Sequence, residues 1–221
     1  KTSKINIHCG VNYLKDISAC QYINENYDSE YIVILRDPIK RMISAINYFK
    51  KIGSEKRTLN EVINEEIKLY KTGRLFESEN QYLYNSLYCL QITNFQNEFP
   101  GTKLHVLSFD SIFTGTEIEL KKFFAIIGIK KENNLNLRFN AYRNKNSQAR
   151  FEILNKIFFS ENKLKSKILS IIPPKIKTRL KWYILEKNIT GKPFSQRISD
   201  SYISELDKIL INEKILIDKI K

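Results

Sequence analysis

A short apolar run that leads into an arginine and a proline constrains the fold of this chain most. Residues 31–35, YIVIL, form the run, and Arg36 and Pro38 follow it directly. Such a continuous run is typical of a strand buried on both faces of a parallel sheet. Proline suits the first turn of a helix, where its missing N–H has no partner to lose. We therefore predict a strand over residues 31–35 and a helix over residues 38–51.

Strand and helix patterns alternate through the first half of the chain. We predict further strands at residues 5–8 and 103–109 and helices at residues 16–27, 58–71, 81–99 and 116–127, with Asp16 and Thr58 as N-caps. Alternation of this kind predicts an α/β fold with three layers, in which helices cover both faces of a central parallel sheet.

The second half of the chain has a different pattern. Residues 130–150 are polar, rich in asparagine and without periodicity, which predicts a long loop. Helices are predicted after it at residues 151–172, 174–188 and 199–219. Nothing resembling a linker separates them from the rest. We therefore predict a single domain over residues 1–221, with 151–221 as its helical C-terminal part.

Composition narrows the classes of partner. The net charge is +13, which is compatible with a nucleic acid or another anion. The charge comes mostly from lysine in a sequence rich in Lys, Ile and Asn, as an AT-rich coding bias produces, and no aromatic RNA-binding pattern or zinc-finger spacing accompanies it. Nucleic acid is therefore not the expected partner, whereas a small anionic ligand suits the charge.

The apolar runs and the cysteines indicate in which cellular compartment the protein is expected. The longest apolar runs are far shorter than the roughly 20 residues that a membrane helix needs, so we expect no membrane segment in this chain. The cysteines are Cys9, Cys20 and Cys89, an odd number without metal-ligand spacing. A reducing, cytoplasmic location is therefore expected. The chain begins with Lys rather than Met, so we also expect a segment upstream, with room for an anchor or signal.

The corner at Arg36 is suited to binding an anion. Ligands bind outside the carboxyl ends of parallel strands, where a helix N-terminus also presents free N–H groups. Arg36 leaves the predicted strand, and Ser44 lies about two turns into the next helix. An arginine fork and a hydroxyl together make a phosphate clamp. Alternatively, Arg36 pairs with a carboxylate such as Asp37, and Ser44 bonds back to its own helix.

The string from Arg36 to Ser44, RDPIKRMIS, closely resembles the 3′-phosphate-binding motif of the sulfotransferase family, R-[DN]-P-x-x-R-x-x-S after an apolar strand. Looser likenesses to that family cover residues 88–112, 118–129 and the C-terminal helices. The resemblance implies a P-loop-like αβα fold and transfer of a sulfuryl group from 3′-phosphoadenosine 5′-phosphosulfate (PAPS) to a hydroxyl or amine of an acceptor, here a saccharide. The product nucleotide is then adenosine 3′,5′-bisphosphate (PAP), and no metal is expected.

The resemblance also implies roles for single residues. Arg36 and Ser44 would hold the 3′-phosphate. Arg41 would either touch the nucleotide or brace its helix through a carboxylate. Tyr88 matches a tyrosine of the family's nucleotide site, although an aromatic residue on a long helix is more often part of the core.

A general base is needed for the transfer. Glycan sulfotransferases use the glutamate of a Glu-Lys-[ST]-x-x-Tyr-Phe segment, and residues 7–14, IHCGVNYL, occupy the corresponding stretch. His8 then falls at the glutamate position, and histidine is a competent base near neutral pH. Alternatively, His8 is an ordinary histidine at a strand end. The departure from glutamate keeps a second hypothesis open, a non-catalytic module of this family that binds an anionic ligand or glycan.

Two loop motifs are missing. The family's 5′-phosphosulfate loop, Pro-Lys-x-Gly-Thr-Thr, does not occur, and we expect it upstream of residue 1. A kinase or NTPase of related fold would need G-x-x-x-x-G-K-[ST]. The chain has only 7 glycines and no such spacing, which speaks against that class.

Overall fold

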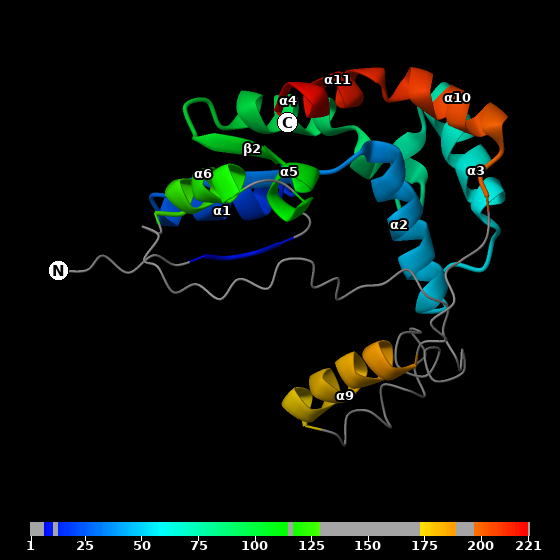
Figure 1. The fold of residues 1–221 in the computed structure, drawn as a ribbon, viewed down its shortest axis with the longest axis horizontal. Coiled ribbons are helices and arrows are strands. Elements are labelled where there is room, and N and C mark those ends of the chain that lie inside the picture. The colour runs from blue at the N-terminus through cyan, green and yellow to red at the C-terminus, as the bar shows by residue number, and fades with distance from the viewer. Residues whose placement is uncertain (1–6, 11–12, 115–116, 129–172, 189–196, 221) are drawn as a thin grey trace. The chain divides into compact units, whose positions relative to one another are not determined.

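The computed structural model spans residues 1–221 and describes residues 7–10, 13–114, 117–128, 173–188 and 197–220 (Figure 1). The chain divides into two compact units. The first unit comprises residues 1–38, 85–141 and 208–221, and the second comprises residues 39–84 and 142–207. The single domain expected over residues 1–221 stays a prediction.

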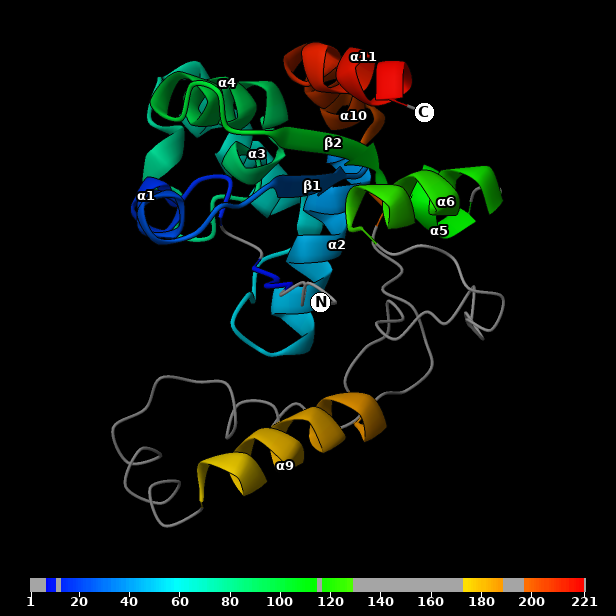
Figure 2. The ribbon, with the colours of Figure 1, turned by 90° about the vertical axis from the view of Figure 1, so that its left-hand side faces the viewer.

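The described residues form a mixed α/β structure with a small parallel sheet and mostly helices. The sheet lies in the first unit and has two strands, β1 (Tyr31–Leu35) and β2 (Leu104–Ser108). They run side by side in Figure 2, with Tyr31 opposite Leu104 and Leu35 opposite Ser108. Both strands and their parallel pairing confirm the sequence prediction. The finer expectation, a three-layer P-loop-like fold, is a proposal.

The strand predicted at residues 5–8 is not seen where the structure describes the chain. Ile7 and His8 are exposed and lie outside any strand, and residues 5 and 6 lie outside the described residues. In the fully described β1, Ile34 is 42% exposed, so this strand is not buried on both faces by the described residues.

Helices flank β1 in the chain as the sequence predicts. Helix α1 (Ile17–Asn26) begins after Asp16, whose side chain accepts a hydrogen bond from the Ala19 N–H over 3.1 Å. Such a cap satisfies one of the helix's unpaired amide donors. Helix α2 (Pro38–Lys51) begins at the proline and ends with two lysines, which favour a helix C-terminus.

Helix α3 (Leu59–Lys71) lies in the second unit and confirms the predicted cap. The Thr58 side chain accepts a hydrogen bond from the Glu61 N–H over 3.2 Å, and the Glu61 carboxylate accepts one from the Thr58 N–H over 2.6 Å. This reciprocal capping box fixes where the helix begins. The predicted boundary at Thr58 is therefore correct.

The long helix predicted over residues 81–99 is wrong at its N-terminal half. Two short 3-10 helices, η1 (Leu75–Glu77) and η2 (Tyr84–Ser86), precede α4 (Tyr88–Glu98). Gln81 has a φ of 49°, a left-handed conformation that a helix cannot continue through. The next two amides, of Tyr82 and Leu83, donate to the Glu66 carboxylate instead of to a helix.

The helices that follow β2 differ from the prediction in number. Helix α5 (Phe109–Thr114) begins at the end of β2 without a loop and was not predicted, whereas α6 (Glu117–Ile126) matches the predicted helix over residues 116–127. Helix α9 (Pro174–Lys187) agrees with the predicted 174–188. The single helix predicted over residues 199–219 is interrupted at Leu210, which separates α10 (Asp200–Ile209) from α11 (Ile211–Ile220). The loop at 130–150 and the helix at 151–172 lie outside the described residues.

One face of the sheet carries the core of the first unit. Leu35, Tyr88 and Ile217 are buried together, and their neighbours are the half-buried Val33, Ile92, Val106, Leu216 and Ile220. Helix α11 therefore packs on α4 and β2, as Figure 2 shows. Because Leu35 is the last residue of β1, this core supports the backbone immediately before Arg36.

The second unit is built on α2 and α3. Its fully buried side chains include Met42, Ile46, Val62, Ile63, Tyr82, Leu83 and Leu206. The Tyr82 ring meets the Phe49 ring edge to face, with 5.7 Å between the ring centroids. Aromatic pairs in this arrangement add roughly 0.5–1.5 kcal/mol to the energy of simple burial.

Candidate functional site at the carboxyl end of the sheet

Arg36 follows the last residue of β1, at the edge where the carboxyl ends of both parallel strands lie. The pairing of Leu35 with Ser108 brings the residues after each strand next to one another. Those residues are Arg36 and Phe109. This edge is the general location of ligand sites in parallel α/β sheets.

The Arg36 side chain is half-buried and has an aromatic neighbour. Its guanidinium carbon lies over the Phe109 ring, 5.2 Å from the ring centroid, a distance typical of a cation–π contact. Its Nε–H is buried without a hydrogen-bond acceptor among the described residues. No ion pair involving Arg36 is present in that same part of the chain. The side chain can therefore offer charge and donors to an anion.

A buried hydrogen bond fixes the backbone at this corner. The Ser86 hydroxyl donates to the Pro38 carbonyl over 3.1 Å, and Ser86 is fully buried. Since Leu35 is held by the core on one side of Arg36 and Pro38 by this bond on the other, the backbone around Arg36 is well supported.

The other predicted phosphate ligand, Ser44, lies on α2 and is exposed. The boundary between the two units falls after Pro38, so Arg36 belongs to the first unit and Ser44 to the second. The predicted clamp of Arg36 with Ser44 stays a prediction. An exposed hydroxyl is nevertheless available to a ligand.

Arg41 makes a bracing contact inside the second unit. Its Nη2 donates to the backbone carbonyl of Tyr82 over 3.3 Å. This acceptor is a main-chain carbonyl, and bracing of the helix by Arg41 through a carboxylate stays a prediction. Contact of Arg41 with a nucleotide stays a prediction.

Tyr88 is a core residue in this structure. It is the first residue of α4, is 5% exposed and packs with Leu35 and Ile217. The core alternative for Tyr88 is therefore what the described residues display, and its nucleotide role stays a prediction.

His8, the predicted base, is exposed and paired with Tyr13. The Tyr13 hydroxyl and His8 Nδ1 are hydrogen-bonded, and the two ring centroids are 5.5 Å apart. Gly10 permits the close packing of this segment, because a Cβ there would lie 2.6 Å from the Tyr13 ring. With Nδ1 occupied, Nε2 is the ring nitrogen left to meet a substrate.

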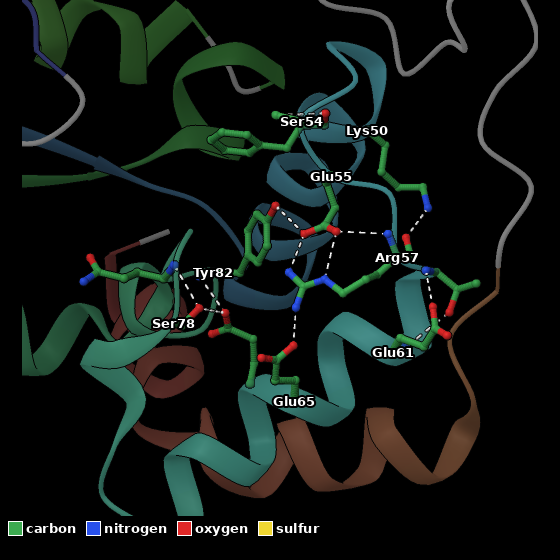
Figure 3. Close-up of polar contacts among 12 residues, drawn as sticks. Lys50, Ser54, Glu55, Arg57, Glu61, Glu65, Ser78 and Tyr82 are labelled. Carbon is green, nitrogen blue, oxygen red and sulfur yellow. Dashed lines mark hydrogen bonds and ion pairs between the residues drawn. The ribbon is translucent and has the colours of Figure 1, made fainter. Parts of the chain in front are cut away.

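A second polar cluster, which the sequence analysis did not single out, lies in the second unit (Figure 3). The buried Glu55 carboxylate accepts hydrogen bonds from Arg57 Nε over 2.9 Å and from the Tyr82 hydroxyl over 3.3 Å. Burial tends to raise the pKa of Glu55, but the hydrogen bonds and charge of Arg57 outweigh it and hold that pKa below its usual value. Burial and the nearby Glu55 charge raise the pKa of Tyr82, which keeps its hydroxyl protonated.

The hydrogen bonds and ion pairs of this cluster indicate a structural role. Arg57 also pairs with Glu65, and Glu66 accepts from Ser78 as well as from the amides of Tyr82 and Leu83. These groups bond one another, so the cluster offers little to a ligand. No local sequence pattern reveals it, because its members come from residues as far apart as Glu55 and Tyr82.

Two searches of the described residues gave negative results. No group of three or more His, Cys, Asp or Glu side chains among them could hold a metal ion. No helix in the described ranges is long and apolar enough to cross a membrane.

Comparison with known proteins identifies no relative of this chain. No protein-family model, curated protein or solved structure matches the chain. The residues of the chain and the geometry around Arg36 are therefore what indicate a function.

Proposed function

We propose that the protein is a sulfotransferase that uses PAPS as donor and a hydroxyl or amine of a saccharide as acceptor. The observation that carries the proposal is Arg36, a cation at the carboxyl end of a parallel strand whose buried Nε–H has no acceptor among the described residues. The string RDPIKRMIS supports it, because its arginine and serine occupy the positions of a 3′-phosphate motif.

The nucleotide is held by charge-assisted hydrogen bonds in this proposal. The Arg36 fork takes two oxygens of the 3′-phosphate, and the exposed Ser44 hydroxyl donates to a third. Arginine suits this task because its planar donors match a phosphate.

Sulfuryl transfer then needs in-line alignment, positive charge around the transferring group and a proton acceptor. The acceptor oxygen or nitrogen forms a bond to sulfur while the bond from sulfur to the 5′-phosphate oxygen breaks, which leaves PAP. The proton of the attacking group passes to His8 Nε2. Tyr13 orients the imidazole through Nδ1, as the third group of a catalytic arrangement does.

Isothermal titration calorimetry tests this proposal. PAP is titrated into the wild-type protein and into Arg36→Ala, with adenosine 5′-monophosphate as the control ligand and circular dichroism to verify folding. We expect PAP to bind the wild-type protein at least tenfold more tightly than the monophosphate, and Arg36→Ala to lose that difference, since a doubly charge-assisted contact is worth about 1.5–3 kcal/mol.

Three results are informative. Failure of folded wild-type protein to bind PAP would contradict the proposal. Equal binding by Arg36→Ala would remove Arg36 from the site. PAP binding by the full-length protein without sulfuryl transfer to any acceptor would favour the non-catalytic module that binds an anionic ligand or glycan.

A further inference from the structure

The Arg36 guanidinium lies over the ring of Phe109. Arg36 follows β1 and Phe109 follows β2, and the pairing of Leu35 with Ser108 sets the two residues beside one another. The separation of 5.2 Å between the guanidinium carbon and the ring centroid is therefore a consequence of the sheet register. No loop has to close to form the contact.

An aromatic face orients an arginine without using its hydrogen-bond donors. The N–H groups of a guanidinium point outward in its plane, whereas the ring lies against its face. A carboxylate in the same place would occupy those donors and neutralise the charge. In the part of the chain that the structure describes, Arg36 has no ion pair, and its buried Nε–H has no acceptor.

We propose that Phe109 is a positioning residue that holds the Arg36 guanidinium in the orientation that receives a 3′-phosphate. The inference rests on the proposed function and adds a residue to it. Phe109 touches no part of the nucleotide and acts only through Arg36. Without the ring, the long Arg36 side chain samples other rotamers, and the ordering of that side chain opposes binding.

The test compares three variants by calorimetry with PAP and adenosine 5′-monophosphate. Phe109→Leu removes the aromatic face and keeps an apolar side chain, while Phe109→Tyr keeps the face. Phe99→Leu is the matched control, because Phe99 also belongs to the first unit and contacts another ring, that of Phe95, with 5.2 Å between the centroids.

Phe109→Leu is expected to weaken PAP binding about fivefold to tenfold and to leave monophosphate binding unchanged. Phe109→Tyr and Phe99→Leu should bind both nucleotides within about twofold of the wild type. The preference for PAP over the monophosphate is the decisive quantity, because a general loosening of the fold would weaken both ligands together.

The outcomes separate this inference from the proposed function. If the wild-type protein prefers PAP and Phe109→Leu keeps the full preference, the positioning role is wrong and the proposed function stands. The same holds if Phe109→Tyr is as weak as Phe109→Leu, or if both nucleotides lose affinity equally. If the wild-type protein itself shows no preference for PAP, both the function and the positioning role are wrong.

Discussion

The Ser86 hydroxyl donates a hydrogen bond to the Pro38 carbonyl over 3.1 Å and links two positions that are 48 residues apart in the sequence. Pro38 starts α2, and Ser86 ends η2 just before α4. This bond and the packing of Leu35 against Tyr88 fix the chain on both sides of Arg36.

Replacement of Ser86 should therefore loosen the corner. Ser86→Ala removes one buried hydrogen bond, and we expect the free energy of unfolding to fall by about 1 kcal/mol. Urea denaturation followed by circular dichroism measures the change. PAP affinity should fall too, since Arg36 loses part of its backbone support. A variant as stable as the wild type would show that the bond is not needed.

Ser44→Ala on α2 should weaken PAP binding without changing the stability of the fold. Because Ser44 is exposed, its replacement should change the free energy of unfolding by less than about 0.5 kcal/mol. The loss of one donor to a phosphate should lower PAP affinity about fivefold, from the value of a single hydrogen bond. Calorimetry with the wild type as reference decides, and unchanged affinity would exclude Ser44 from the nucleotide site.

Glu66 should be one of the most sensitive positions of the second unit. Its carboxylate is buried and accepts from the Leu83 N–H over 2.8 Å and the Tyr82 N–H over 3.3 Å. Glu66→Ala leaves both amides without that acceptor, and we expect a loss of roughly 3 kcal/mol in the free energy of unfolding. The control for urea denaturation is Glu65→Ala, one position earlier on α3, which removes only an exposed ion pair with Arg57 and should therefore cost much less. Equal losses of stability in the two variants would contradict the structural role of the Glu66 hydrogen bonds.

Glu213 should make the docking of α11 depend on pH. Burial raises the pKa of this carboxyl, although the backbone N–H groups of Glu213 and Cys89 lower it in part. A carboxyl whose pKa is raised by folding stabilises the fold fully below its unfolded pKa, and this contribution is lost as the pH rises through the folded pKa. Glu213→Gln cannot ionise and still offers an oxygen to Cys89.

We therefore expect the advantage of Glu213→Gln over the wild type, in free energy of unfolding, to increase as the pH rises from about 4 to about 7. Urea denaturation at several pH values measures it. Glu205→Gln on α10 is a partly exposed control. A difference that shrinks with rising pH would mean that the buried carboxylate is stabilised, not penalised, by its surroundings.

His8→Ala should separate chemistry from nucleotide binding. A general base contributes about 10²-fold to 10⁴-fold, so the rate of PAP release from PAPS in the presence of saccharide acceptors should fall by at least about 10²-fold. PAP affinity should stay unchanged. The assay uses the full-length protein, and Tyr13→Phe should show a smaller loss. Full activity in His8→Ala would assign the base to another residue.

The sequence predicts local features of this molecule better than distant ones. The boundaries of β1, α2 and α3 follow from an apolar run, a proline and a capping box, all of which act within a few residues. The start of α4 could not be predicted, because the amides before it bond to Glu66, a residue of α3. The interruption at Leu210 could not be predicted either, because no Gly or Pro occurs in residues 200–219.

The residues of the candidate site likewise differ in how far the sequence reveals them. Arg36 is recognisable from the strand and the motif around it, whereas Phe109 is not, because the contact depends on the pairing of Leu35 with Ser108 across a parallel sheet. The likeness of Tyr88 to a family tyrosine did not reveal its place in the core. That core is formed with Ile217, which lies near the other end of the chain.

Binding of a 3′-phosphate by the Arg36 guanidinium can be followed at the side-chain Nε–H resonance of Arg36. Two-dimensional ¹H–¹⁵N spectra identify this resonance by its loss in Arg36→Lys, and PAP or adenosine 5′-monophosphate is then titrated into the labelled protein. The account predicts a saturable shift of the Arg36 signal with PAP and none with the monophosphate. A protein that binds PAP while the Arg36 signal stays in place, or that gives the same shift with both nucleotides, would contradict it.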